Sequence, residues 1–251
     1  MADSHLISPA GANPRFAGFA PAKPAWPRFT LGAPVLDAVL GGGLSRGALH
    51  ELYAAGEADA ASAAGFALML ALRAGGRQGH LLWLRQARGS GRLHGPGLAE
   101  LGADPARLLV VNLADARTLL KAAADVVRSP AAGTVVIAPA LPAPRIDLTV
   151  TRRLLLAAER SGVTAILLRG WGAQLPSAAA TRWLVAAAPS SALEAGAPGA
   201  PALALDLVRQ RGGPPSTGWR LEWDRDAAGF VAAPLSGAPS ADAGGGRLAA
   251  G

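Results

Sequence analysis

The sequence has no cysteine, and among its 251 residues only Lys23 and Lys121 are lysines. Without cysteine the chain forms no disulfide bond, offers no thiolate nucleophile and builds no cysteine zinc site. The four histidines lie in unrelated contexts, and neither a metal-binding spacing nor a nucleophile motif occurs around them. The sequence therefore predicts no catalytic residue, no bound metal and no cofactor.

Long apolar runs are also absent from the sequence. No stretch approaches the roughly 18 apolar residues that argue for a membrane span, and the sequence begins without the basic and apolar regions of a signal peptide. Hydrophobic residues nevertheless make up 51% of the chain, and the mean hydropathy of +0.28 excludes a mostly disordered protein. We expect one cytoplasmic α/β domain with tails and without membrane contact.

The charge balance is basic, with a formal net charge of +7. All of the 24 basic residues except the two lysines are arginines. Such a balance suits contact with nucleic acid. The arginines are scattered rather than gathered in a run, which favours a solvated basic surface, and direct DNA contact stays open as an alternative.

The stretch over residues 31–72 organises our interpretation of the chain. A short helix with one apolar face is expected over 34–40, followed by a glycine turn at 41–43. An apolar strand over 48–53 and a long apolar helix over 62–73 come next. This order resembles the opening of a RecA-type ATPase core, in which a glycine-rich loop with a lysine and a hydroxyl holds phosphates and magnesium.

The chemistry of such a core is missing from this chain. The loop over 54–65 contains no lysine, and neither lysine of the chain follows a glycine. No carboxylate follows the strand over 80–85, where a RecA-type ATPase presents its catalytic glutamate, and Gln86 or a neighbour stands there instead. Ala138 ends the next buried strand, where the magnesium-binding acid is expected. Because phosphoryl transfer depends on charge stabilisation, we expect a nucleotide-binding fold without hydrolysis.

Strands and helices alternate through the rest of the chain. Asp115 and Asp147 are each suited to cap an amphipathic helix, and an entirely apolar strand separates the two helices. Two strands around the turn RQRGGPPSTG are typical of a β-hairpin. The pattern predicts an α/β fold, a degenerate RecA-like core with a mostly parallel twisted sheet flanked by helices and a C-terminal β-hairpin.

We expect this RecA-like domain, without a functional phosphate loop, to cover residues 28–233. The segment over 1–27 is rich in proline and alanine, which predicts a flexible arm. The low-complexity segment over 234–251 predicts a disordered tail.

The candidate contact residues are arginines and tryptophans at strand ends and turns in the second half of the sequence. Such pairs serve in stacking, phosphate binding or protein interfaces, although they also occur as a tryptophan core surrounded by arginine stems. The segments that match the mobile DNA-binding loops of RecA-type proteins are short, so protein contact is favoured over a DNA groove. The candidates are Arg169, Trp171, Arg182, Trp183, Arg209 and Arg211.

Five stretches, spread over about residues 29–226, together resemble the ImuA family. They are LDAVLGGGLSRGALHELY, LGADPARLLVV, IDLTVTRRLLLAAERSGVTAILLR, PSAAATRWLVAAAPS and RQRGGPPSTGWRLEWD. The resemblance implies a RecA-related, SulA-like, non-catalytic and cytoplasmic accessory protein of SOS-induced mutagenesis. Its implied partners are an ImuB-like Y-family polymerase homologue and an error-prone DNA polymerase, with RecA as a further candidate.

Two other classes of function stay open at this point. A SulA-like inhibitor of cell division would share the remnant of the fold and would bind FtsZ. A divergent ATPase that uses unconventional residues is the enzyme alternative, and it requires nucleotide-dependent stabilisation or ATP hydrolysis.

Overall fold

The computed structural model describes residues 27–75, 80–89, 92–141, 146–191 and 199–232. The predicted N-terminal arm, except for its last residue, and the predicted C-terminal tail lie outside these ranges. Within them, no helix combines the length and the apolar character that crossing a membrane requires.

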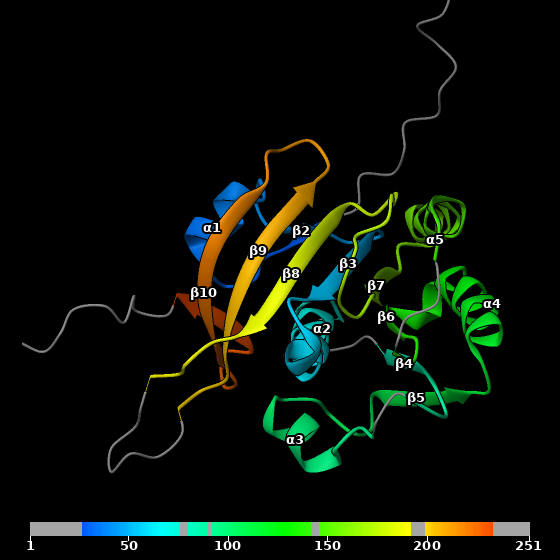
Figure 1. The fold of residues 1–251 in the computed structure, drawn as a ribbon, viewed down its shortest axis with the longest axis horizontal. Coiled ribbons are helices and arrows are strands. Elements are labelled where there is room, and N and C mark those ends of the chain that lie inside the picture. The colour runs from blue at the N-terminus through cyan, green and yellow to red at the C-terminus, as the bar shows by residue number, and fades with distance from the viewer. Residues whose placement is uncertain (1–26, 76–79, 90–91, 142–145, 192–198, 233–251) are drawn as a thin grey trace, which may run out of the picture.

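The fold is organised around a parallel sheet whose central strand is β3 (Leu49–Ala54). On one side of β3 the sheet continues through β7 (Thr164–Leu168), β6 (Thr134–Ala138) and β4 (Leu81–Gln86), all in parallel register. The edge strand on this side is β5 (Leu108–Leu113), which pairs in parallel with β4 (Figure 1). Because the strands are parallel, their carboxyl ends lie along one edge of the sheet.

On the other side of β3 the sheet becomes antiparallel. The strand β8 (Thr181–Ala187) is still parallel to β3, and β9 (Ala202–Gln210) then pairs antiparallel with it. The strand β10 (Ser216–Asp224) forms the predicted hairpin with β9, and β11 (Gly229–Ala232) closes this edge. The predicted RecA-like fold class is thereby confirmed, while the short β11 is an addition that the sequence did not predict.

Helices cover both faces of the parallel half of the sheet, as Figure 1 shows. The helix α2 (Ala60–Gly75) packs on one face, and α4 (Ala116–Val127) and α5 (Leu148–Ser161) pack on the other. Alternate side chains of a strand point to opposite faces. Val136 accordingly belongs to the α2 cluster, whereas Val135 belongs to the cluster with α4 and α5.

The two long helices on the second face begin at the predicted caps. The Asp115 carboxylate accepts a hydrogen bond from the N–H of Thr118 at 2.7 Å. The Asp147 carboxylate does the same for the N–H of Val150 at 2.9 Å. Each cap satisfies a backbone donor that the helix itself leaves unpaired, which confirms both predictions. The second helix ends at Gly162, whose φ of +81° is in the left-handed region.

The glycine turn lies between two very short strands, β1 (Arg28–Phe29) and β2 (Leu44–Ser45), which the sequence did not predict. The helix α1 (Pro34–Val39) precedes it. At Gly43 the φ is +103°, and a Cβ atom would collide with the carbonyl group of Phe29. Only glycine fits at this position, because the turn brings two backbones into contact.

Candidate functional site

The loop that follows β3 occupies the place of a phosphate loop. It forms a short 3-10 turn, Glu57–Asp59, and α2 then begins at Ala60. The Asp59 carboxylate accepts a hydrogen bond from the N–H of Ala187, at the end of β8, at 2.8 Å. Glu57 adds a second, exposed carboxylate. The start of the helix, which attracts negative charge, therefore carries the protein's own acids where a nucleotide would present phosphates.

The ends of β4 and β6 lie side by side next to this loop. The Gln86 side chain, predicted near the position of the catalytic glutamate, accepts a hydrogen bond from the N–H of Ala140 at 2.8 Å. This contact joins the ends of the two strands. Among the described residues, no group of three or more histidine, aspartate or glutamate side chains is placed to hold a metal ion.

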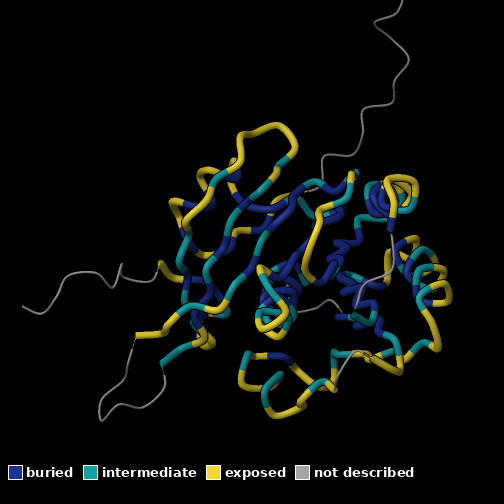
Figure 2. The backbone as a smooth tube through the Cα atoms, viewed as in Figure 1, coloured by how far each residue is buried: buried dark blue, intermediate teal, exposed yellow. Residues whose placement is uncertain are grey.

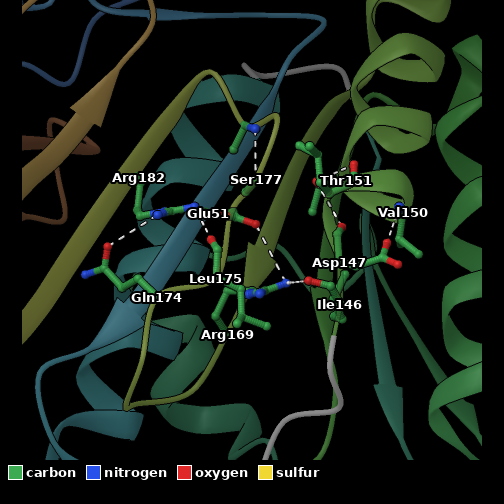
Figure 3. A network of polar contacts seen from close by, with 12 residues as sticks. Glu51, Ile146, Asp147, Val150, Thr151, Arg169, Gln174, Leu175, Ser177 and Arg182 are labelled. Carbon is green, nitrogen blue, oxygen red and sulfur yellow. Dashed lines mark hydrogen bonds and ion pairs between the residues drawn. The ribbon is translucent and has the colours of Figure 1, made fainter.

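A buried carboxylate lies on the central strand of the sheet: Glu51 of β3 has no exposed surface. Two hydrogen bonds from Arg182, at 3.3 and 3.2 Å, reach its Oε2 atom. Its Oε1 atom lies 3.8 Å from Nη1 of Arg169 (Figure 3). One buried acid thus faces two buried guanidinium groups, which is the pairing that makes a charge tolerable in a protein interior.

Tyr53, two residues further along β3, completes the cluster. Its hydroxyl oxygen accepts a hydrogen bond from Nε of Arg169 at 3.1 Å. The guanidinium groups of Arg169 and Arg182 lie 5.7 and 5.5 Å from the centre of its ring. An aromatic face attracts cations at such distances. The ring therefore offsets part of the excess positive charge that one carboxylate leaves among two arginines.

The same two arginines also donate hydrogen bonds to backbone carbonyl groups of two connecting segments. Arg169 donates to the carbonyl oxygen of Ile146, just before α5, at 2.9 Å. Arg182 donates to the carbonyl oxygen of Leu175 at 2.8 Å and to the side chain of Gln174 at 3.5 Å (Figure 3). The segment before α5 and the segment before β8 are therefore both tied to the charge cluster.

Two further predicted arginines hold the neighbouring residues of the same loop from outside. Arg209 donates to the carbonyl oxygen of Ser177 at 2.6 Å. Arg211 lies 3.1 Å from the carboxylate of Glu159 and donates to the carbonyl oxygen of Ala178 at 3.5 Å. We call residues 174–178 the clamped segment, because four of the six candidate residues donate hydrogen bonds to it or to the adjoining loop.

The six candidates divide into buried and exposed side chains. Trp183 has no exposed surface, and Arg169 and Arg182 are 6% and 9% exposed. Their placement matches the alternative in which a tryptophan is core and arginines pack beside aromatic side chains. Trp171 is 36% exposed, and both Arg209 and Arg211 are exposed. Only these three reach a partner without a rearrangement of the core.

Sequence reasoning missed Glu51, which is the residue that brings the arginines together. It is the one acid of β3, and its partner Arg182 lies 131 residues further along the chain. An isolated acid inside a predicted buried strand was the available signal, because an uncompensated charge is costly there.

His50, the neighbour of Glu51 on β3, is also fully buried. Its ring nitrogens lie 2.7 Å from the hydroxyl oxygen of Thr181 and 3.0 Å from the carbonyl oxygen of Ser45. Burial lowers the pKa of His50 from 6.5 to about 4, against a smaller opposing effect of the Ser45 carbonyl. The imidazole is therefore neutral at physiological pH and acts as a structural link between β3 and β8.

The fold and the altered phosphate loop define a RecA-like domain. The crystal structure of the RadB recombinase aligns with this chain at a TM-score of 0.55, covering 82% of this chain and 100% of RadB. The sequence identity is 13%, so this similarity concerns the fold. No protein-family model matches the sequence.

The sequence comparison is more specific. Protein ImuA from Caulobacter vibrioides, in strains NA1000 / CB15N and ATCC 19089 / CIP 103742 / CB 15, is 32% identical to this chain over 216 residues. The alignment covers 78% of this chain and 83% of the Caulobacter protein. The chain belongs to the ImuA family, as the sequence motifs predicted.

The buried cluster predicts that Glu51→Gln destabilises the fold by about 3 kcal/mol or more, because two guanidinium groups stay buried without their carboxylate. Urea denaturation measures this change in the free energy of unfolding. The matched control is Asp125→Asn, which removes the carboxylate charge of a solvent-exposed pair with Arg128 and should cost less than about 1 kcal/mol. Equal effects of the two substitutions would show that the Glu51 cluster contributes no special stability.

His50 predicts a defined loss of stability in acid. The folded state keeps the imidazole neutral down to about pH 4, whereas the unfolded chain binds a proton near its ordinary pKa of about 6.5. Since the unfolded state binds more protons between these values, the free energy of unfolding should fall by about 3 kcal/mol on acidification through this range. Denaturation at several pH values should show this slope in the wild type and in His80→Gln, an exposed control, but not in His50→Gln.

Proposed function

We propose that this chain is a non-catalytic, cytoplasmic accessory component of an SOS-induced mutasome. In this role it acts with an ImuB-like Y-family polymerase homologue and an error-prone DNA polymerase during translesion synthesis. Membership of the ImuA family supports a role in damage-induced mutagenesis. The observation that carries the non-catalytic part is the loop after β3, where Glu57 and Asp59 stand in place of a phosphate-binding lysine.

Electrostatics support the absence of nucleotide chemistry. A phosphate loop works because backbone N–H groups and a lysine receive negative charge. Here the carboxylate of Asp59 stands at the start of α2, where it accepts a hydrogen bond from the N–H of Ala187 in β8, and Glu57 adds negative charge at the same helix start. A polyphosphate placed there would meet two like charges, and such contacts oppose binding.

The clamped segment supports a docking role. Its backbone is held by Arg182 and Arg209, so its shape depends on side chains of the protein itself. A preformed loop loses little conformational freedom on binding, which favours recognition by a protein partner. The exposed Trp171 belongs to the same loop, and tryptophans are frequent anchors at protein interfaces.

Contact with protein is favoured over contact with DNA at the exposed arginines. The guanidinium group of Arg209 donates to a carbonyl group, and that of Arg211 pairs with Glu159. A DNA phosphate would have to displace these partners. We therefore favour protein contact over DNA contact at these arginines. Co-purification of the tagged chain can detect both kinds of partner.

Co-purification of the tagged chain from DNA-damaged cells tests the proposal. We expect an ImuB-like protein to accompany it, with an error-prone polymerase or RecA, and we expect deletion of the gene to lower the damage-induced mutation frequency. Recovery of FtsZ without any polymerase would instead favour inhibition of cell division. An unchanged induced mutation frequency in the deletion strain would contradict the proposal.

A thermal unfolding assay tests the loss of nucleotide binding separately. Ligands that bind only the folded state raise the melting temperature by an amount that grows with the logarithm of their concentration relative to their Kd. We expect ATP with magnesium at about 1 mM to give no saturable rise, with sodium tripolyphosphate as a control for ionic strength. A saturable rise of several degrees with ATP and magnesium that the tripolyphosphate control does not show would revive the nucleotide-binding alternative.

A further inference from the structure

A cavity of about 670 Å³ lies where the nucleotide machinery of an ATPase would be. It is bounded by the start of α2, including Ala61 and Ala64, and by the ends of β4, β6 and β7. The helix α3 (Gly95–Glu100) forms the opposite wall with Leu98. Small apolar side chains stand along α2 in place of the large polar ones that a phosphate site needs, so the space is open and apolar. Its size is typical of ligand pockets.

A second cavity, of about 700 Å³, continues from the first one toward the edge of the sheet. The two cavities share four lining residues, Arg85, Arg92, Leu93 and Leu98. The second cavity reaches Val110 on the edge strand β5. Together they form one groove, which we call the α2–β5 groove, running from the altered phosphate loop to the rim of the sheet.

Apolar surface is exposed where the groove meets the edge of the sheet. Val110 of β5, which lines the groove, is 42% exposed, and Figure 2 shows exposed stretches on β5 and α3 beside each other. Leu109 is 51% exposed, and as the alternate residue of the strand it lies on the opposite face. Within the described residues β5 is hydrogen-bonded to β4 on one side only. An edge strand with exposed aliphatic side chains is a common place for an extended peptide to add.

The charged residues of the groove have one sign. Arg85 and Arg92 line both cavities, and the residues that line either one include no aspartate or glutamate. His94 also lines the groove, and its Nδ1 atom accepts a hydrogen bond from the N–H of Gly97 at 3.2 Å. The apolar walls therefore carry a positive rim, which complements a segment with apolar side chains and adjacent carboxylates.

We propose that the α2–β5 groove is a docking site for an acidic, apolar peptide segment of a partner protein. This inference rests on the proposed docking function and assigns it a surface. The chain's own terminal segments are poorer occupants by charge. Residues 1–26 contain one acidic residue, Asp3, against Arg15 and Lys23, and residues 233–251 contain Asp242 balanced by Arg247.

Single-stranded DNA is also a poorer occupant of this groove. Binding of single strands uses aromatic faces on which bases stack. The aromatic residue that lines the cavity beside α2, Trp83, is only 2% exposed and offers no free face. Apolar walls and two arginines instead match the recognition of a peptide through a few buried side chains and a charged flank.

Fluorescence anisotropy with the full-length chain tests the proposal. The probes are labelled peptides of roughly 15 residues, tiled across the ImuB-like protein and the RecA of the same genome, a length that spans one groove. We expect the binding peptides to combine large apolar residues with net negative charge. Arg92→Glu should weaken their binding about tenfold or more, because it places like charges together.

Two further variants separate the groove from general effects. Ala61→Trp, at an exposed position of α2 that lines the cavity, fills the space and should weaken binding at least about tenfold. Arg153→Glu, on the exposed side of α5, makes the same charge change as Arg92→Glu away from the groove and should leave binding within about twofold. Melting temperatures near that of the wild type establish that the variants are folded.

The outcomes distinguish this inference from the proposed function. If full-length ImuB-like protein binds the wild type and the two groove variants equally well, the groove assignment is wrong and the docking function stands. If the peptides that bind are basic, or if Arg153→Glu weakens their binding as much as Arg92→Glu does, the assignment is also wrong. If neither the full-length partner nor any tile binds, both proposals fail.

Discussion

One buried carboxylate determines how the segments before α5 and before β8 are held against the sheet. Glu51 sits at the centre of the sheet without exposed surface, and its charge has to be balanced by Arg169 and Arg182. Because these guanidinium groups are buried beside Glu51, their remaining N–H groups donate to the backbone carbonyl groups of Ile146 and Leu175. The position of the loops is thus a consequence of neutralising one internal charge. In nucleotide-dependent relatives of this fold class, bound phosphate can supply such organisation from outside.

The fold was largely readable from the sequence because its determinants are local. Continuous apolar runs identify strands buried on both faces, and Asp115 and Asp147 mark the starts of the helices that they cap. The short strands β1, β2 and β11 escaped prediction, since a few residues carry no periodic pattern. Pairing with distant partners, rather than local propensity, decides whether such segments are strands.

The candidate site was harder to predict from the sequence, because an arginine side chain can serve either in ligand contact or in an internal ion pair. Arg169 and Arg182 stand at a turn and near a strand end, each close to a tryptophan, a context that fits ligand contact and internal pairing alike. Their outcome depends on Glu51, which is remote in sequence and close only after the parallel strands pair. Exposure then separates Trp171, Arg209 and Arg211 from the buried members of the set. Such a division follows from the three-dimensional neighbours and could not be obtained from spacing along the chain.

The replacement of a phosphate loop by a turn that carries its own acids has a consequence for timing. ATPases of the RecA class can be reset, because hydrolysis removes the ligand that holds their loops. In this protein the loop after β3 is joined to the end of β8 by a hydrogen bond from Ala187 to Asp59, which lies within the chain itself. For the proposed non-catalytic docking module, assembly with a partner then depends on the concentrations of the two proteins rather than on a cycle of nucleotide hydrolysis.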